Sequence, residues 1–287
     1  MKARLIVEYG SRLPVRRKCY LAEVPRSSFY ASCDRPESRR ARRNRYLLMY
    51  IKDEHDKSRQ TYGSRRIYVE LQKRGIRCSI NRIARLMKLH GIVAVQHRKY
   101  RPTTDSGHDF PVAPNLLGRK FRVAAPNRVW VADITYIPTD EGWLYLATEL
   151  DLYSHRIVGW SLSSRMSRRL VLDALALAVG RRRPEPGLIH HSDRGVQYAC
   201  GDFQKALKRY GMVPSMSRKG DPYDNAVAES FFKTLKVELV YRRRFRTRLE
   251  AKAAIVEYIE LFYNRRRLHS SLGYLSPAEY EELAIAA

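Results

Sequence analysis

The 287-residue chain is longer than most single domains, so we expect two or three domains, of which at least one buries a sizeable core. Its 55 Lys and Arg residues outnumber 29 Asp and Glu residues and leave a net charge of +26, which predicts a polyanionic partner such as nucleic acid. No apolar run approaches the ~18 residues of a membrane span, and the apolar stretch at the N-terminus is too short for a signal peptide, so no membrane association is expected.

The distribution of charge and the cysteines narrow the class further. Residues 1–120 carry 29 basic and 10 acidic residues, whereas the remainder carries 26 and 19, so the first half is predicted to be the main binding half. The four cysteines (Cys19, Cys33, Cys78 and Cys200) show no spacing typical of a metal cluster. They predict reduced thiols in a cytosolic protein, and no zinc-binding module is expected.

The first hundred residues have helical patterns. Residues 1–33 contain a short helical pattern and the turn "VPRSSF", which favours a small helical DNA-binding element. Residues 34–100 hold a basic helix, "ESRRARRNRYLLMYIKDEHDK", and then two shorter amphipathic helices. Ser64 and Ser79 are the expected N-caps of these two helices, and Gly75 is the expected stop between them. This pattern predicts a helix-turn-helix domain.

Two arginines of this domain are candidate DNA contacts. Arg82 and Arg85 lie off the apolar face of the second short helix, where they can reach phosphates or base edges. The alternative, that either side chain only solvates the helix, stands equally for each residue. Residues 101–126 follow as an aperiodic stretch with three prolines, which predicts a linker.

After residue 126 the periodicity becomes that of an α/β domain, which we place at residues 127–240. "RVWVADITYIPT" alternates like a strand, and "GWLYLATELDLYSHRIVGWSLS" is typical of two further strands. The helix "SRRLVLDALALAVGRR" comes next, and the short strands "GLIHHSD" and "VPSMS" follow with a helix between them. This order predicts a mixed sheet with flanking helices, and residues 241–287 are expected to form a helical C-terminal segment.

Three acidic residues of the α/β domain are candidates for chemistry. Asp133 lies inside a strand, Asp193 follows the strand "GLIHHS" at the end where open α/β sheets place ligands, and Glu229 lies on the helix in "GDPYDNAVAESFFKTLK". Each has an ordinary explanation as well: a buried acid satisfied by hydroxyls, a turn residue, and half of a surface pair with Lys233. Together they can converge on hard cations, and two Mg²⁺ ions ~3.5–4 Å apart suffice for phosphodiester transfer.

These residues also carry a resemblance to a known family. The segments "WVADITYI", "HSDRGVQY" and "DNAVAESFFKTLK", with 35 residues between Asp193 and Glu229, closely resemble the catalytic core of retroviral-integrase-like DDE transposases. Over the whole chain, including "RIARLMKLHGI" and "YNRRRLHSSLGYLSPAEY", the sequence is similar to the OrfB protein of a bacterial insertion sequence. The resemblance implies a ribonuclease-H-like α/β fold with a mixed five-stranded sheet, preceded by all-α helix-turn-helix modules.

The resemblance further implies an activity, which is metal-dependent cleavage and strand transfer of insertion-sequence ends by two-metal-ion phosphoryl transfer. It implies Asp133, Asp193 and Glu229 as ligands of Mg²⁺ or Mn²⁺, with two ions expected. The residues that match DNA-contacting positions of the family are Lys233, Lys236 and Asn225. The implied partners are double-stranded DNA at terminal inverted repeats and target sites, further copies of the chain on that DNA, and an upstream-frame protein. The implied location is the bacterial cytoplasm, in association with the nucleoid.

Three alternatives remain open at this point. The chain lacks a sustained heptad pattern, so it can be a partial product that needs fusion to an upstream frame. It can also be a DNA-binding regulator of transposition with an inactive core. A tyrosine recombinase would use "RRRLHSSLGY", Arg265 to Tyr274, but this segment lacks the His-x-x-Arg box of that mechanism.

Overall fold

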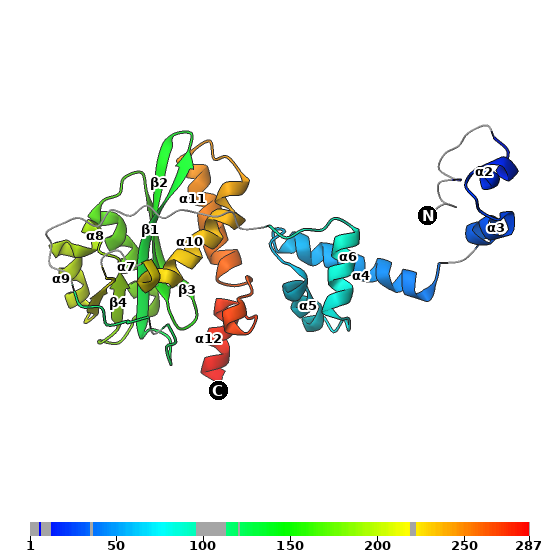
Figure 1. The fold of residues 1–287 in the computed structure, drawn as a ribbon. Helices are drawn as coiled ribbons and strands as arrows, with labels where there is room; N and C mark the ends of the chain where they lie inside the picture. Colours follow the sequence, from blue (N-terminus) through cyan, green and yellow to red (C-terminus); the bar gives the residue numbers. More distant parts are fainter. Residues whose placement is uncertain are drawn as a thin grey trace.

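The computed structural model describes residues 6, 13–34, 37–95, 113–119, 121–218 and 222–286. Figure 1 shows an α/β body that contains the sheet, a three-helix domain beside it, and a pair of short helices at the N-terminal end. No helix in the described ranges is long and apolar enough to cross a bilayer. The four cysteines are all free thiols.

The α/β body is built on a five-stranded sheet in the order β3-β2-β1-β4-β5, which confirms the predicted mixed sheet. β1 pairs antiparallel with β2 and β2 with β3, whereas β4 runs parallel to both β1 and β5. The strands are β1 (Val129–Thr139), β2 (Gly142–Asp151), β3 (Arg156–Ser163), β4 (Ile189–Ser192) and β5 (Val213–Met216). The flanking helices are α7 (Arg168–Arg182), α8 (Val196–Ala199), α9 (Gly201–Arg209), α10 (Ala226–Glu238) and α11 (Arg248–Glu257).

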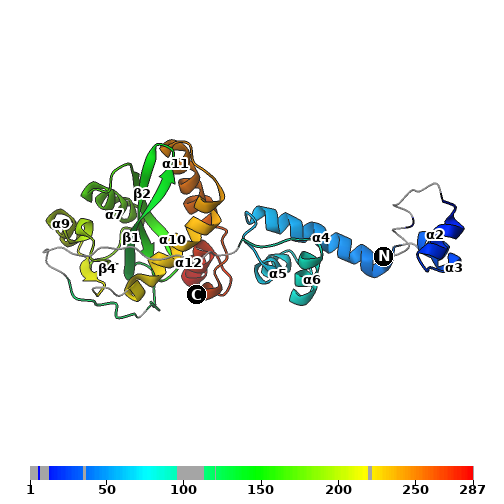
Figure 2. The same cartoon turned by 45° about the horizontal axis from the view of Figure 1, so that its top comes forward.

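Alternating residues of β1 pack into two separate cores, one on each face of the sheet. Val129 and Val131 belong to the core that α10 and α11 cover, and Trp130 and Ala132 belong to the core under α7 and α9. Figures 1 and 2 show α10 and α11 on one side of the strands and α7 and α9 on the other. Continuing the alternation places Asp133 on the α10 face.

The close packing of α7 on β3 depends on one glycine. A Cβ atom at Gly159 would lie 2.6 Å from Cβ of Ala178, and the carbonyl of Ala174 would be closer still. Real Cβ atoms do not approach a helix backbone this closely, so any side chain at this position would push α7 off the sheet.

The three-helix domain comprises α4 (Arg39–Lys57), α5 (Ser64–Lys73) and α6 (Ile80–Leu89), around a core that contains Ile51, Ile67 and Ile83. The Ser79 hydroxyl accepts a hydrogen bond from the Arg82 amide at 3.3 Å and caps α6 as predicted. Gly75 has φ +72° after α5, in agreement with the predicted stop. Ser64 is the first residue of α5 and Gly63 is its cap, which corrects the predicted capping residue.

The N-terminal pair consists of α2 (Val15–Leu21) and α3 (Arg26–Asp34). Its core is small, because only Ile6, Cys19 and Phe29 are buried together among the described residues of this part. Glu23 turns the chain between the helices with φ +53°. Two short helices with a tight turn agree with the helical element predicted within residues 1–33.

The C-terminal segment contacts both the α/β body and the three-helix domain. It continues from α11 through the π-helical turn η3 (Tyr258–Tyr263), the 3₁₀ turn η4 (Ser270–Leu272) and α12 (Pro277–Ala286). Tyr258 and Tyr263 belong to the core under α10, whereas Leu268 belongs to the core of the three-helix domain. Residues 113–119, inside the predicted linker, also lie against the α/β body, where Leu117 is buried.

Candidate active site

The sheet register brings two of the three predicted acids to adjacent positions. Ala132 of β1 pairs with Ser192 of β4 in the parallel ladder, so the next residue on each chain, Asp133 and Asp193, lies at the same level of the sheet. Asp193 Oδ1 accepts a hydrogen bond from the Gly195 amide at 2.9 Å, which fixes the turn after β4. The register therefore places Asp193, just after the end of β4, beside Asp133 within β1.

The charges of the other two acids act on Asp133. Burial raises the pKa of Asp133 well above its usual range, and the negative charges of Asp193 and Glu229 raise it further. The Ile134 amide, which donates to Asp133 Oδ1 at 2.7 Å, acts in the opposite direction. A site that crowds carboxylates in this way is stabilised by a bound cation.

Glu229 projects from the first turn of α10 and is exposed to solvent. Partial desolvation raises the pKa of its carboxyl group. No ion pair joins it to Lys233 in the part of the chain that the structure describes, so the ordinary explanation of an i,i+4 surface pair is not supported. The charge of Glu229 acts on Asp133 and raises the pKa of its carboxyl group.

Asn225 anchors the helix that carries Glu229. Its side-chain amide donates to the carbonyl of Ala132 at 3.1 Å, one residue before Asp133, and the residue is only 5% exposed. The DNA contact expected of Asn225 stays a prediction, and in this structure its side chain is buried. The hydrogen bond to Ala132 holds the start of α10 against β1.

Asp224, the residue before Asn225, is a second anchor that the sequence did not single out. Its carboxylate is fully buried and accepts hydrogen bonds from the Asn115 side chain at 2.8 Å and from the Arg218 amide at 2.9 Å. The Arg218 guanidinium, together with Arg119, lowers the pKa of Asp224 to about 2. Its place in the polar loop "DPYDN" immediately before α10 was the signal available in the sequence.

The two lysines on α10 lie in different environments. Lys233 is exposed, one turn after Glu229. Lys236 is 9% exposed, with its Nζ 4.9 Å from the centre of the Tyr136 ring, and burial lowers the pKa of its ammonium group while the charge of Asp133 acts to raise it. Lys233 is therefore exposed on the surface of α10, whereas Lys236 is buried against Tyr136 of β1. The DNA contacts expected of both lysines stay predictions.

The donor set fits a hard divalent cation. Asp133, Asp193 and Glu229 offer only carboxylate oxygens, the ligands that Mg²⁺ and Mn²⁺ prefer. As the side chains stand, no three His, Cys, Asp or Glu residues among those described form a closed ion-binding group. The three acids thus share one charged site without forming a ready-made cage.

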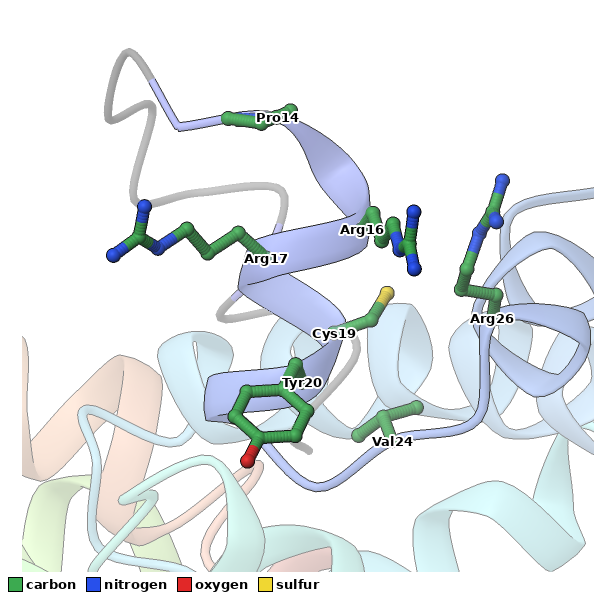
Figure 3. Close-up of a pocket in the computed structure, with 7 residues that line it drawn as sticks. All are labelled: Pro14, Arg16, Arg17, Cys19, Tyr20, Val24 and Arg26. Carbon is green, nitrogen blue, oxygen red and sulfur yellow. The ribbon is translucent and has the colours of Figure 1, made fainter.

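The predicted DNA contacts of the three-helix domain lie at the surface of α6. Arg85 is exposed, and the partly exposed Arg82 donates from Nε to Asn44 Oδ1 at 2.9 Å. The N-terminal pair has its own arginines around a hollow of about 530 Å³. In Figure 3, the side chains of Arg16 and Arg26 lie on the same side of α2, and Arg17 points away on the other side.

Comparison with known proteins agrees with this architecture. One family model, "Integrase core domain", matches residues 123–222, a second of the same description matches residues 229–284, and "HTH-like domain" matches residues 41–100. An uncharacterized 31 kDa protein of insertion element IS600 from Shigella sonnei is 47% identical over 92% of this chain and 97% of its own length. The transposase InsF for IS3A from Escherichia coli is 39% identical over the full length of both chains.

Solved structures with a similar arrangement are more distant in sequence. A simian T-cell lymphotropic virus intasome in complex with a PP2A regulatory subunit contains a chain that is 14% identical, with a TM-score of 0.47 over 80% of this chain and 74% of its own. The HTLV-2 integrase catalytic core domain in complex with magnesium is 15% identical, with a TM-score of 0.44 over 56% of this chain and 99% of its own.

Proposed function

The chain belongs to the family of insertion-sequence transposases with an integrase core domain, and we propose that Asp133, Asp193 and Glu229 hold the divalent ions with which it cleaves and joins DNA. Membership of this family makes the chain a DDE-type polynucleotidyl transferase that acts in DNA transposition. The substrates we assign are the terminal inverted repeats of the element and a target duplex. Each transfer replaces one phosphodiester bond by another, first with water and then with the freed 3′-hydroxyl as the nucleophile.

The observation that carries the assignment is the convergence of three independent elements on Asp133. The β1–β4 register sets Asp193 beside it, Asn225 fixes the start of α10 to the carbonyl of Ala132, and the charge of Glu229 acts on its carboxyl group. A merely structural acid at this place would be paired with a cation. The positive charge that acts on Asp133 is that of Lys236, whose ammonium group is itself partly desolvated.

Each residue then has a distinct task in the transfer. When bound, two Mg²⁺ or Mn²⁺ ions supply charge neutralisation and activation of the attacking oxygen. Asp133 and Asp193 hold their positions rigidly, because both lie on backbone fixed by the sheet and its first turn. Glu229 completes the set from α10, and the exposed Lys233 on the next turn is placed to hold a DNA phosphate.

Oligomeric state and further partners belong to the same proposal. Transposition joins two element ends to one target, so we assign the active form to several copies of the chain assembled on DNA. An upstream-frame protein is a further assigned partner, and the bacterial nucleoid is the assigned location.

The segment Arg265 to Tyr274, considered above for a tyrosine nucleophile, has a structural role in this fold. Arg267 is buried and donates to both carboxylate oxygens of Glu238, and His269 is buried beside it. Neither residue is free to bind a phosphodiester. This environment argues against a recombinase mechanism through Tyr274.

The assignment is tested by Glu229→Gln, with Glu282→Gln on the exposed surface of α12 as the matched control. With a labelled element-end duplex and Mg²⁺ or Mn²⁺, cleavage and joining should fall by about 10²–10³-fold or more in the first variant and stay unchanged in the second. Binding measured by gel shift in EDTA should be the same for both. Retained joining by Glu229→Gln would refute the ligand assignment, and a wild-type chain that binds but never cleaves would indicate the regulator instead.

A further inference from the structure

A cleft of about 340 Å³ opens between the first half of α4 and the turn that leads into α6. Four arginines and three residues with apolar surface surround it: Arg42, Arg43, Arg77, Arg82, Tyr46, Leu47 and Ile76. No acidic residue contributes to its wall. Four like charges around one hollow repel each other, so the cleft is unfavourable unless an anion enters it.

Acidic residues of the same domain pair with basic residues outside the cleft. Residues 37–95 contain 16 Lys and Arg but only five Asp and Glu. Asp53 pairs with Lys57 and Arg74, and Glu54 pairs with Arg74. Within the described residues, none of the four cleft arginines forms an ion pair with an acid, so their charge remains available to a ligand from outside.

Two of the cleft side chains are held in place before any ligand binds. Arg82 is fixed by its hydrogen bond to Asn44. The Tyr46 ring is 62% exposed and braced from behind by Tyr50, with ring centres 5.2 Å apart and the hydroxyl groups 3.1 Å apart. A fixed guanidinium and a fixed aromatic face lose little conformational entropy on binding.

The position of the cleft favours DNA that also reaches α6. Arg82 belongs to the first turn of α6, the second helix of the helix-turn-helix, whose N-terminal residues meet base edges in this motif. The first half of α4 points away from the α/β body in Figure 1, whereas Arg59, just after the end of α4, forms an ion pair with Glu257 of α11. The cleft is thus at the open end of the domain.

We propose that this cleft binds the sugar–phosphate backbone of duplex DNA beside the groove that α6 enters, an inference that rests on the proposed function. The guanidinium groups contact successive phosphates, and Tyr46 with Ile76 packs against a deoxyribose. An amphipathic cleft matches this ligand because a nucleotide backbone alternates anionic and apolar groups. The contact supplies affinity and orientation without reading sequence.

The test measures binding of the full-length chain to a fluorescein-labelled 30-base-pair duplex of random sequence in EDTA, at a series of salt concentrations. Arg43→Ala and Arg77→Ala should each weaken binding about 3- to 10-fold near 0.15 M salt and reduce the slope of log K against log salt by about one unit. Tyr46→Ala should weaken binding with the slope unchanged, and Tyr46→Phe should bind like the wild type.

Arg45→Ala is the matched control, because Arg45 lies on the same helix, is exposed, and pairs with Glu37 outside the cleft. Equal effects of Arg45→Ala and the two cleft substitutions would overturn the proposal. A loss confined to single-stranded DNA of the same length would overturn it as well. The measurement needs neither metal nor cleavage, so it is independent of whether Glu229→Gln abolishes joining.

Discussion

Two aspartates in this protein show how the surroundings of one side chain decide its use. Asp133 is grouped with Asp193 and Glu229, and the pKa of its carboxyl group is raised. Asp224 is surrounded by Asn115, Arg218 and Arg119, and its pKa is lowered to about 2. A bound cation would therefore stabilise the ionised carboxylate of Asp133. Asp224 is already ionised by its neighbours and anchors the loop before α10.

The sequence allowed Asp133, Asp193 and Glu229 to be predicted because their positions relative to strand ends and the opening of a helix are local features. Asn225 and Asp224 were harder, since both lie in one polar loop and only the fold shows which atoms they reach. An amide that contacts Ala132, 93 residues earlier in the chain, leaves no local pattern. The role of a polar loop residue therefore depends on contacts that periodicity does not encode.

His269 provides a prediction about pH at the residue scale. It is buried, and burial together with the charges of Arg267, His155 and Arg66 lowers its pKa well below the usual range. Below about pH 6.5 His269 binds a proton in the unfolded chain but not in the folded chain. This histidine therefore lowers the free energy of unfolding as the pH falls.

Urea unfolding at pH 8, 7, 6 and 5 checks this sign. The free energy of unfolding of the wild type should decrease below about pH 6.5, with up to about 1.4 kcal/mol per pH unit due to His269. His269→Gln should have a smaller decrease over the same interval, after allowance for the general loss from the substitution. Parallel curves for the two proteins would show that His269 is not held neutral in the fold.

Among the elements, α10 has ends that perform different tasks. Its first turn presents Glu229 to solvent at the active site, and its last residue, Glu238, is buried against Tyr258 and Arg267. On a helix, Glu229, Lys233 and Lys236 lie near one face. The sequence could not show that Tyr136 covers the C-terminal part of that face and leaves the N-terminal part open, because the cover comes from another element.

The ion pair at the end of α10 gives a prediction at the scale of the element. Arg267 donates to both oxygens of Glu238, at 2.8–3.1 Å, and both side chains are 7% exposed. Arg267→Met should reduce the free energy of unfolding by about 3–5 kcal/mol, because Glu238 stays buried without its cation. The double variant Arg267→Met with Glu238→Gln should recover part of the loss in the same urea titration. Equal losses in single and double variants would mean that packing of the Arg267 side chain, rather than charge, is what matters.

At the scale of the whole molecule, the C-terminal segment joins the three-helix domain to the α/β body. Tyr62 donates to the carbonyl of Arg266 at 2.9 Å and accepts from the amide of Leu268 at 2.8 Å, while Lys73 pairs with Glu279. Arg267, which lies between Arg266 and Leu268, forms an ion pair with Glu238 at the end of α10. Composition and charge predicted a DNA-binding front half and a separate catalytic half, but not this contact, because its partners lie about 200 residues apart in the chain.

Tyr62→Phe tests whether this contact makes the two parts unfold together. The substitution leaves the Arg266 carbonyl and the Leu268 amide without partners in a buried place, which costs about 1–3 kcal/mol. We expect calorimetry of the wild type to show one transition that includes both parts, and the variant to show a separate transition of the three-helix domain at lower temperature. Tyr50→Phe is the control, because the Tyr50 hydroxyl bonds only to Tyr46 within one helix. If Tyr62→Phe instead unfolds in one transition at the temperature of the control, the hydroxyl does not couple the parts, and the ion pairs Arg59–Glu257 and Lys73–Glu279 must hold them together.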